Sequence, residues 1–406
     1  QNTLENMLLN ELILTDRNLR RYSRESYVPY TYKGKTYYFL DMIAYLNKVY
    51  QLSGWGEDNM YGKIPRNVTY NLLLSYDPEL AYLIHPAARD GGRHMYYTLN
   101  MQETRARETF EALFCYLGDK FGGELAPGGG PDKKYRVSNW VIGNEVNCCQ
   151  VWNYSGELSL SDCVKNYAEA FQLLYQGVKR GYSNTKVFIS LDHDWNAGEN
   201  GHGGKEFLDE FARYMYQTAP GMNWNVDYHP YSQPLPRNDF WNDYSNTTDS
   251  ISTAFISMRN LNVLTNYLGE LEKKYGMYNK DGTGRGYIRV MLGEQGFTTG
   301  GGESQQRQAA AIGYGFYLAM ENKRVDSYII RSYNDDPAEG IMQMGLMDRY
   351  DKKKESYNVY WNIDRGKQNS LNAMNPYRGI TGVGSWESRF SGVLQEIQYR
   401  YDNYGW

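Results

Sequence analysis

Two glutamates far apart along the chain stand in the same local sequence context. Residues 140–147 read Trp-Val-Ile-Gly-Asn-Glu-Val-Asn, so an apolar run passes through a glycine to Glu145. Residues 288–294 read Ile-Arg-Val-Met-Leu-Gly-Glu, so a second, mostly apolar run ends at Glu294. Short apolar runs of this kind are typical of strands buried in a parallel sheet. Because an unpaired charge at the end of a buried strand is costly, both glutamates are candidate functional residues.

Two carboxyl groups that face each other can hydrolyse a glycosidic bond. One donates a proton to the leaving oxygen, and the other meets the developing oxocarbenium charge. A separation of about 5–5.5 Å gives retention of configuration, whereas about 6.5–9.5 Å leaves room for water and gives inversion. The two groups need different environments, one that keeps a proton and one that stays ionised. We therefore expect Glu145 and Glu294 to share one pocket; salt-bridged structural glutamates are the alternative.

The elements that would position these glutamates alternate between strands and helices. Apolar runs predict eight strands, over residues 8–14, 68–75 and 95–99, then a fourth that ends at Glu145, and over residues 187–191, 226–228, 288–292 and 327–330. Helical spacing of apolar residues predicts helices that begin near residues 42, 104, 161, 206, 252 and 305, and a hairpin is predicted over residues 30–39. This alternation predicts an α/β fold, a single (β/α)8 TIM barrel over residues 1–406 with long loops on its C-terminal rim. From about residue 365 we expect a loop-rich tail.

Further polar and aromatic residues follow the predicted strands. In a TIM barrel the carboxyl ends of all strands share one rim, where active sites are built. The resulting candidates for substrate binding are Asn144, His193, Trp195, His229, Tyr231, Trp152, Arg331 and Asn100, with Trp361 as a further stacking wall. Aromatic rings suit a ligand that has both apolar faces and hydroxyl groups. The alternatives are a strand cap for His193, a place in the packed core for the tryptophans, and an exposed polar loop for Arg331.

Composition narrows the class of protein. The net charge of −4 over 406 residues, with scattered Lys and Arg, argues against a dedicated nucleic-acid binder. No apolar run approaches the ~18 residues of a membrane span. The four cysteines lack C-x-x-C spacing, so free thiols are expected. The chain begins at Gln1 without a signal segment, so we expect a processed protein that is secreted or on a bacterial cell surface, with a cytoplasmic location left open.

Four motifs, in order along the chain, resemble those of a known group of enzymes. They are Trp-Val-Ile-Gly-Asn-Glu-Val-Asn at 140–147, Ser-Leu-Asp-His-Asp-Trp at 190–195, Tyr-His-Pro-Tyr at 228–231 and Gly-Glu-Gln-Gly-Phe at 293–297. Together they resemble clan A of the retaining glycoside hydrolases, and within it a bacterial TIM-barrel family long described as a domain of unknown function. The resemblance runs from about residue 8 to residue 364.

The resemblance implies a role for each glutamate. Glu145 would be the acid/base and Glu294 the nucleophile of a glycoside hydrolase that acts on an oligosaccharide or polysaccharide. In this clan an aromatic residue or a histidine after strand six touches the nucleophile, which points to His229 or Tyr231. A proton donor and a carboxylate suffice for the reaction, so we expect no metal and no cofactor. The pair Cys148-Cys149 departs from the pattern and leaves the neighbouring substrate contacts open.

Two other functions remain open. Asp192, His193, Asp194 and His229 are of metal-ligand types, which would suit a metal-dependent phosphoesterase, although the chain has five histidines in all. A carbohydrate-binding barrel without catalysis is the second alternative. The sequence does not specify the sugar, its linkage, endo or exo action, or the oligomeric state.

Overall fold

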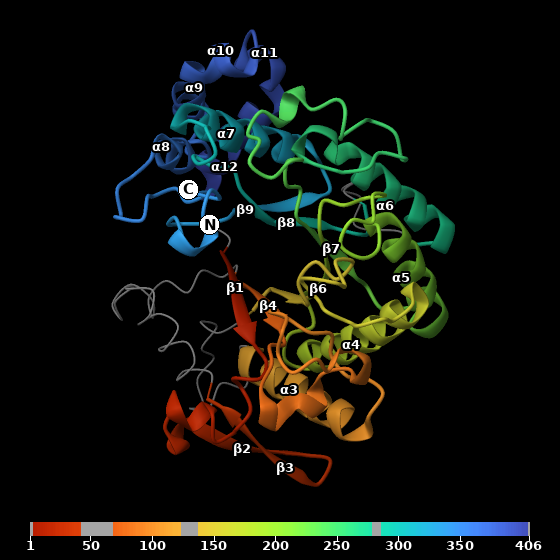
Figure 1. The fold of residues 1–406 in the computed structure, drawn as a ribbon. Helices are drawn as coiled ribbons and strands as arrows, with labels where there is room; N and C mark the ends of the chain where they lie inside the picture. The colour runs from red at the N-terminus through yellow and green to blue at the C-terminus, as the bar shows by residue number, and fades with distance from the viewer. Residues whose placement is uncertain (1–2, 42–67, 123–136, 278–285, 405–406) are drawn as a thin grey trace. The chain divides into compact units, whose positions relative to one another are not determined.

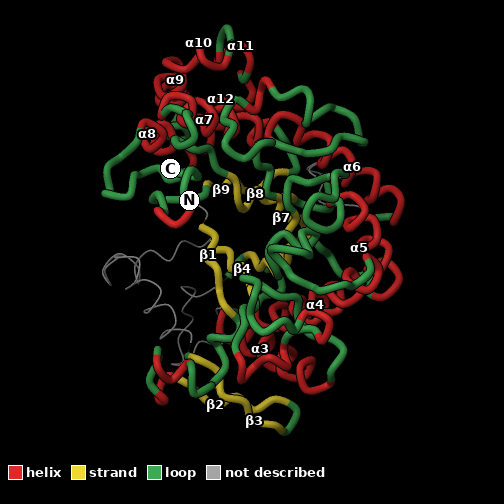
Figure 2. The backbone as a smooth tube through the Cα atoms, viewed as in Figure 1, coloured by secondary structure: helices red, strands yellow, loops and turns green. Residues whose placement is uncertain are grey.

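The computed structural model describes residues 3–41, 68–122, 137–277 and 286–404 (Figure 1). Within these residues seven strands form one sheet, and Figure 2 shows them in yellow together with a separate hairpin. Their hydrogen-bonded order is β1 (Thr3–Leu8), β4 (Val68–Leu73), β5 (Asn139–Ile142), β6 (Lys186–Leu191), β7 (Asn225–Tyr228), β8 (Val290–Gln295) and β9 (Val325–Ile330). The pairs β1–β4, β4–β5, β5–β6 and β8–β9 run parallel. The parallel α/β class is confirmed, and closure into an eight-stranded barrel stays a prediction.

The N-terminal elements differ in part from those predicted. β1 occupies residues 3–8 instead of 8–14. The predicted hairpin is confirmed, with β2 (Tyr27–Tyr32) antiparallel to β3 (Lys35–Leu40). The helix predicted to begin near residue 42 lies outside the described residues.

The strand predicted over residues 95–99 is wrong. The N–H of Tyr97 donates to the carbonyl oxygen of Leu74 at 2.8 Å, and that of Thr98 donates to Tyr154 at 3.0 Å. This segment forms isolated bridges only. Its backbone groups are thus satisfied by loops, and it joins no sheet.

The chain divides into two compact units, residues 1–191 with 198–227 and residues 192–197 with 228–406. The first contains the helices α3 (Thr104–Phe121), α4 (Leu160–Gly181) and α5 (Gly204–Thr218). The second contains α6 (Leu261–Tyr275), α7 (Gln305–Glu321), α8 (Glu355–Asn362), α9 (Lys367–Met374), α10 (Arg378–Thr381), α11 (Trp386–Arg389) and α12 (Ser391–Tyr404). Of the helices that the structure describes, none is long and apolar enough to cross a membrane.

The helix predicted to begin near residue 252 begins later, at the first residue of α6. A 3-10 helix (Met258–Asn260) precedes it. The side-chain amide of Asn260 donates to the carbonyl oxygens of Thr248 at 2.8 Å and Phe255 at 3.0 Å. These bonds hold the preceding segment as a loop, because a side chain that satisfies backbone groups competes with helix formation.

The tail from about residue 365 is helical, which corrects the expectation of a loop-rich end. The rings of Trp386 and Phe390 lie 5.6 and 5.1 Å from that of Tyr317 on α7. Trp386, Phe390 and Leu394 are almost completely buried. The short helices of the tail are stabilised by burial against α7, because isolated helices of this length are marginal in water.

Glycines set the distance between α3 and α4. A methyl group at Gly118 on α3 would overlap the carbonyl of Gly177 on α4, and one at Gly181 would overlap the carbonyl of Gly118. The two backbones therefore touch, and no larger side chain fits between them without displacing a helix.

We predict that Gly118→Ala lowers the free energy of unfolding by about 1–3 kcal/mol, because overpacking forces the helices apart. Gly392→Ala in α12 is the matched control, since open space surrounds that position and alanine favours a helix. Chemical denaturation of both variants measures the effect. Equal stability of the two variants would contradict the close contact between α3 and α4.

Candidate active site

The carboxylate of Glu294 lies near the end of β8 and is held by two donors. The hydroxyl of Tyr231 donates to its Oε1 at 2.8 Å, and Nη1 of Arg331 donates to the same oxygen at 3.1 Å. Within the described residues, Oε2 accepts no hydrogen bond from the protein. The side chain is about one-quarter exposed. One oxygen is thus anchored, and the other is available to a ligand.

Arg331, which follows β9, joins two carboxylates. Its Nη1 contacts Glu294 and its Nη2 contacts Glu339, which ends a short 3-10 helix (Pro337–Glu339). Burial tends to lower the pKa of Arg331, but the charges of Glu294 and Glu339 and the Tyr231 phenol outweigh it and hold that pKa above its ordinary value. The guanidinium of Arg331 and the phenol of Tyr231 thus hold the same oxygen of Glu294.

The neighbours of Tyr231 are aromatic. The His193 ring stacks on Phe255 with centroids 5.3 Å apart and meets Tyr231 edge-on at 6.4 Å. Its Nε2 lies 3.4 Å from Oε1 of Gln233. His229, directly after β7, is buried. Among the residues predicted for substrate binding, the structure thus brings His193, Tyr231 and Arg331 together around Glu294.

Glu145 does not continue β5 but lies in a turn after it. Its φ is +46°, in the left-handed region, and Gly143 two residues earlier has φ +77°. The Glu145 N–H donates to Oγ of Ser190 at 3.0 Å, and the Val146 N–H donates to the Ser190 carbonyl at 2.9 Å. The strain of a glutamate in this conformation persists because β6 holds the turn at these two points. Such strain is characteristic of functional sites.

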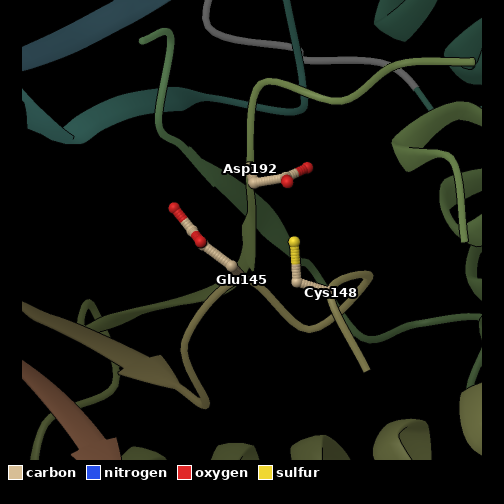
Figure 3. A group of neighbouring side chains, drawn as sticks. All are labelled: Glu145, Cys148 and Asp192. Carbon is tan, nitrogen blue, oxygen red and sulfur yellow. The ribbon is translucent and has the colours of Figure 1, made fainter. Parts of the chain in front are cut away.

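Glu145 has acidic and sulfur neighbours. Ligand-type atoms of Glu145, Cys148 and Asp192 all lie within 4.8 Å of one another, and the three side chains are buried (Figure 3). Repulsion between two carboxylates at this distance favours a proton on one of them. A thiolate and two carboxylates are also of the types that bind Zn²⁺, so these residues are the candidates for holding a metal.

Three predicted residues keep an accessible position. Asn144 is half-buried beside Glu145, whereas Trp152 after β5 and Trp361 on α8 are exposed. All four cysteines are buried free thiols, in agreement with the prediction.

Two predicted residues have structural positions instead. Trp195 is completely buried, and its indole N–H donates to the carbonyl of Ile251 at 3.1 Å. Asn100 is completely buried, and its amide binds Tyr82, Gln102 and Glu103, where α3 begins. Neither side chain reaches the surface in this structure, and substrate binding at the two positions stays a prediction.

Some contacts could not be inferred from the sequence. Glu339 and Ser190 lie in segments where no acidic or hydroxyl role was indicated, and they become relevant only through Arg331 and Glu145. Asp192 was a candidate metal ligand together with its neighbours. In the structure it groups with Glu145 and Cys148, while Oδ1 of Asp194 accepts the N–H of Ala197 at 2.8 Å.

Comparisons with known proteins give one family and several distant structures. A family model described as "Family of unknown function (DUF5722)" matches residues 4–389. No curated protein is significantly similar in sequence. A β-glucosidase from Thermotoga maritima is 13% identical with a TM-score of 0.45, over 83% of this chain and 79% of that one.

Two further solved structures are similar at the same level. The agarase AgWH50C is 12% identical with a TM-score of 0.42, over 93% of this chain and 56% of that one. A β-glucuronidase 2 from Bacteroides uniformis is 9% identical with a TM-score of 0.40, over 72% of this chain. The present chain spans 27% of the length of that glucuronidase.

We predict that Glu145→Gly is more stable than Glu145→Ala by about 1 kcal/mol, because only glycine adopts a left-handed φ without strain. Lys33, whose φ is +48° in the β2–β3 turn, provides the matched pair Lys33→Gly and Lys33→Ala. Thermal unfolding of the four variants measures both differences. A difference at Lys33 with none at Glu145 would show that the turn after β5 is not strained.

Proposed function

The chain belongs to the family of unknown function DUF5722, and we propose that it is a retaining glycoside hydrolase whose two catalytic residues are Glu145 and Glu294. The observation that carries the proposal is the carboxylate of Glu294, with Oε1 bound by Tyr231 and Arg331 and Oε2 without a donor among the described residues. A nucleophilic carboxylate needs this arrangement, because one oxygen must be fixed while the other attacks.

The reaction follows from the two environments. Oε2 of Glu294 attacks the anomeric carbon while Glu145 gives its proton to the leaving oxygen, which yields a covalent glycosyl-enzyme. Glu145 then takes a proton from water, and that water attacks the anomeric carbon and releases Glu294. Asp192, within 4.8 Å of Glu145, supports its acid role because a like charge favours the protonated form.

The proposal also specifies the fold around the two glutamates and the kind of substrate. It requires the two carboxyl groups to lie about 5–5.5 Å apart, which an eight-stranded barrel formed by one catalytic domain would provide. Asn144, His193, His229 and Trp152 would contact the sugar around the two glutamates. The substrate would be a carbohydrate chain degraded outside the cell or at its surface.

We predict that replacing each glutamate by alanine fails in a different way. Glu294→Ala cannot form the covalent intermediate, so azide restores only turnover with inverted configuration. Glu145→Ala is still glycosylated by a substrate with a good leaving group, because that step needs no proton, and azide then gives a glycosyl azide of retained configuration. Proton NMR of the products on an aryl glycoside measures both outcomes.

Each alternative result has a defined meaning. Exchanged results would reverse the two roles, and inversion by the unmutated enzyme would exclude the double-displacement mechanism. Asp209→Ala on α5, where Asp209 pairs with Lys205 at 2.8 Å, is a control for the loss of an acidic side chain outside the two strand ends. Binding of a carbohydrate with no product from the unmutated protein would favour a non-catalytic binding function.

A second candidate function is a metal-dependent phosphoesterase, which the three donors Glu145, Cys148 and Asp192 favour. The two functions use Glu145 differently, since a metal ligand cannot also act as the proton donor. We predict that the purified protein holds no stoichiometric zinc and that chelator leaves its glycosidase rate unchanged. Elemental analysis and rates before and after chelation measure this. If the unmutated protein holds zinc and the Cys148→Ser variant does not, the glycosidase role of Glu145 would be overturned.

A further inference from the structure

Four side chains spaced four residues apart form a continuous line along α8 and its flanks. Tyr357 and Trp361 have nearly parallel rings, at 8° with centroids 6.2 Å apart. Nζ of Lys353 lies over the Tyr357 ring, 4.3 Å from its centroid, and Cζ of Arg365 lies over the Trp361 ring at 3.9 Å. The i, i+4 spacing places Tyr357 and Trp361 side by side on one face of α8, and the ring contacts extend this line to the residues on either side of the helix. We call Lys353, Tyr357, Trp361 and Arg365 the α8 stripe.

The α8 stripe is not needed for the packing of its helix. Val359 is completely buried and Ser356 lies beneath the surface, so these two residues face the interior. Trp361 is 43% exposed. A tryptophan on the solvent face of a helix costs hydrophobic free energy, which a ligand would recover on binding.

The two cations at the ends of the α8 stripe form no ion pair with a described residue. Asp351 accepts from Asn334, and Glu355 accepts from Tyr377 at 3.3 Å. Burial raises the pKa of Asp364, and the neighbouring charge of Arg365 lowers it in part, so Arg365 has one carboxyl group near it. Both cations lie over aromatic rings, whose faces attract positive charge. The stripe therefore presents ordered aromatic surface with positive charge at each end.

The stripe is continuous with the surroundings of Glu294. Tyr333 is two residues beyond Arg331, which contacts Glu294, and its side chain is 48% exposed. The Met347 N–H donates to the Tyr333 carbonyl at 2.9 Å and fixes this segment. Burial and the adjacent Tyr357 phenol raise the pKa of Tyr333, so the two phenol groups are neighbours. An exposed aromatic path thus leads from the end of β9 to α8.

We propose that the α8 stripe and Tyr333 bind an acidic polysaccharide, one that carries carboxylate or sulfate groups, next to the candidate active site. The inference rests on the proposed function for its substrate class. Tyr and Trp rings suit sugar faces with their hydroxyl edges, and Lys353 and Arg365 complement negative groups on the same chain. Because the cations already lie over the rings, little side-chain freedom is lost on binding.

The test measures binding without requiring turnover. Affinity electrophoresis in gels that contain alginate, dextran sulfate or neutral dextran gives a dissociation constant for each polymer. We expect tighter binding to alginate or dextran sulfate than to dextran, weakened by salt. Trp361→Ala should weaken it about tenfold, since it removes a ring face and the support of Arg365. The double variant Lys353→Gln/Arg365→Gln should weaken acidic-polymer binding by a similar factor and leave dextran binding unchanged.

Matched variants show whether the α8 stripe itself binds the polymer. Tyr216→Ala, which removes an exposed tyrosine of α5, should bind like the unmutated protein. Thermal unfolding identifies any variant that fails to fold, and Trp361→Phe, which keeps a ring, should retain most of the affinity. Three results would overturn the proposal. They are equal binding of dextran and the acidic polymers, no effect of Trp361→Ala in folded protein, and, in a gel that contains DNA, binding as tight as that of the acidic polysaccharides.

The outcome is independent of catalysis. If Glu294→Ala and the unmutated protein both bind alginate but neither releases product, the surface stands and the hydrolase assignment fails. If hydrolysis occurs and Trp361→Ala changes neither binding nor the ratio of kcat/KM on polymer to that on aryl glycoside, the surface assignment fails alone.

Discussion

The charge of Glu294 at the end of a buried strand is the constraint around which the second unit is organised. A carboxylate removed from water is costly unless a cation and hydrogen-bond donors replace its hydration. Arg331 supplies the cation and Tyr231 supplies a hydroxyl, so segments after β7 and β9 are fixed to β8 through one oxygen. Arg331 in turn contacts Glu339, which fixes the short helix beyond it. Three separate segments are thereby joined through one partly buried carboxylate.

The turn that carries Glu145 is stabilised by different means. The near neighbours of its carboxylate include Asp192 and Cys148, which favour a proton on one of the acidic groups. The left-handed φ at Glu145 strains the backbone. Hydrogen bonds to Ser190 on β6 maintain this conformation. The two glutamates thus have different environments, with a guanidinium and a phenol beside Glu294 and a carboxyl group and a thiol beside Glu145.

The α8 stripe also places charged groups beside partners, in this case on the surface of the protein. Lys353 and Arg365 lie over aromatic faces and neither forms an ion pair with a described residue, so their positive charge can meet a ligand. A salt bridge at either position would neutralise that charge. Stability of α8 comes from its inner face and from packing with α7 and α9, and its outer face is therefore available for binding.

The sequence alone indicated which segments are buried and which of them end near a polar side chain that could take part in a reaction. Local patterns predicted several elements: apolar runs indicated β5, β6, β7 and β8, and helical spacing of apolar residues indicated α4. Because Glu145 and Glu294 lie in or just after two of these runs, both could be identified from the sequence. The family resemblance narrowed the residue that contacts Glu294 to His229 or Tyr231, and the structure shows the contact of Tyr231. The tail helices could not be predicted, since burial of Trp386 and Phe390 against α7 stabilises them and is not a local property.

Tertiary structure decided which side chains meet. The local sequence does not indicate the burial of Trp195 and the exposure of Trp361, because the buried tryptophan has the polar neighbours Asp194 and Asn196. The grouping of Asp192 and Cys148 with Glu145, and of Glu339 with Arg331, joins residues from separate segments. The spacing of apolar residues indicates which face of a helix or strand is buried and where that element ends. The partners of a charged atom depend instead on how the loops pack. That packing is a property of the whole fold, which one segment does not encode.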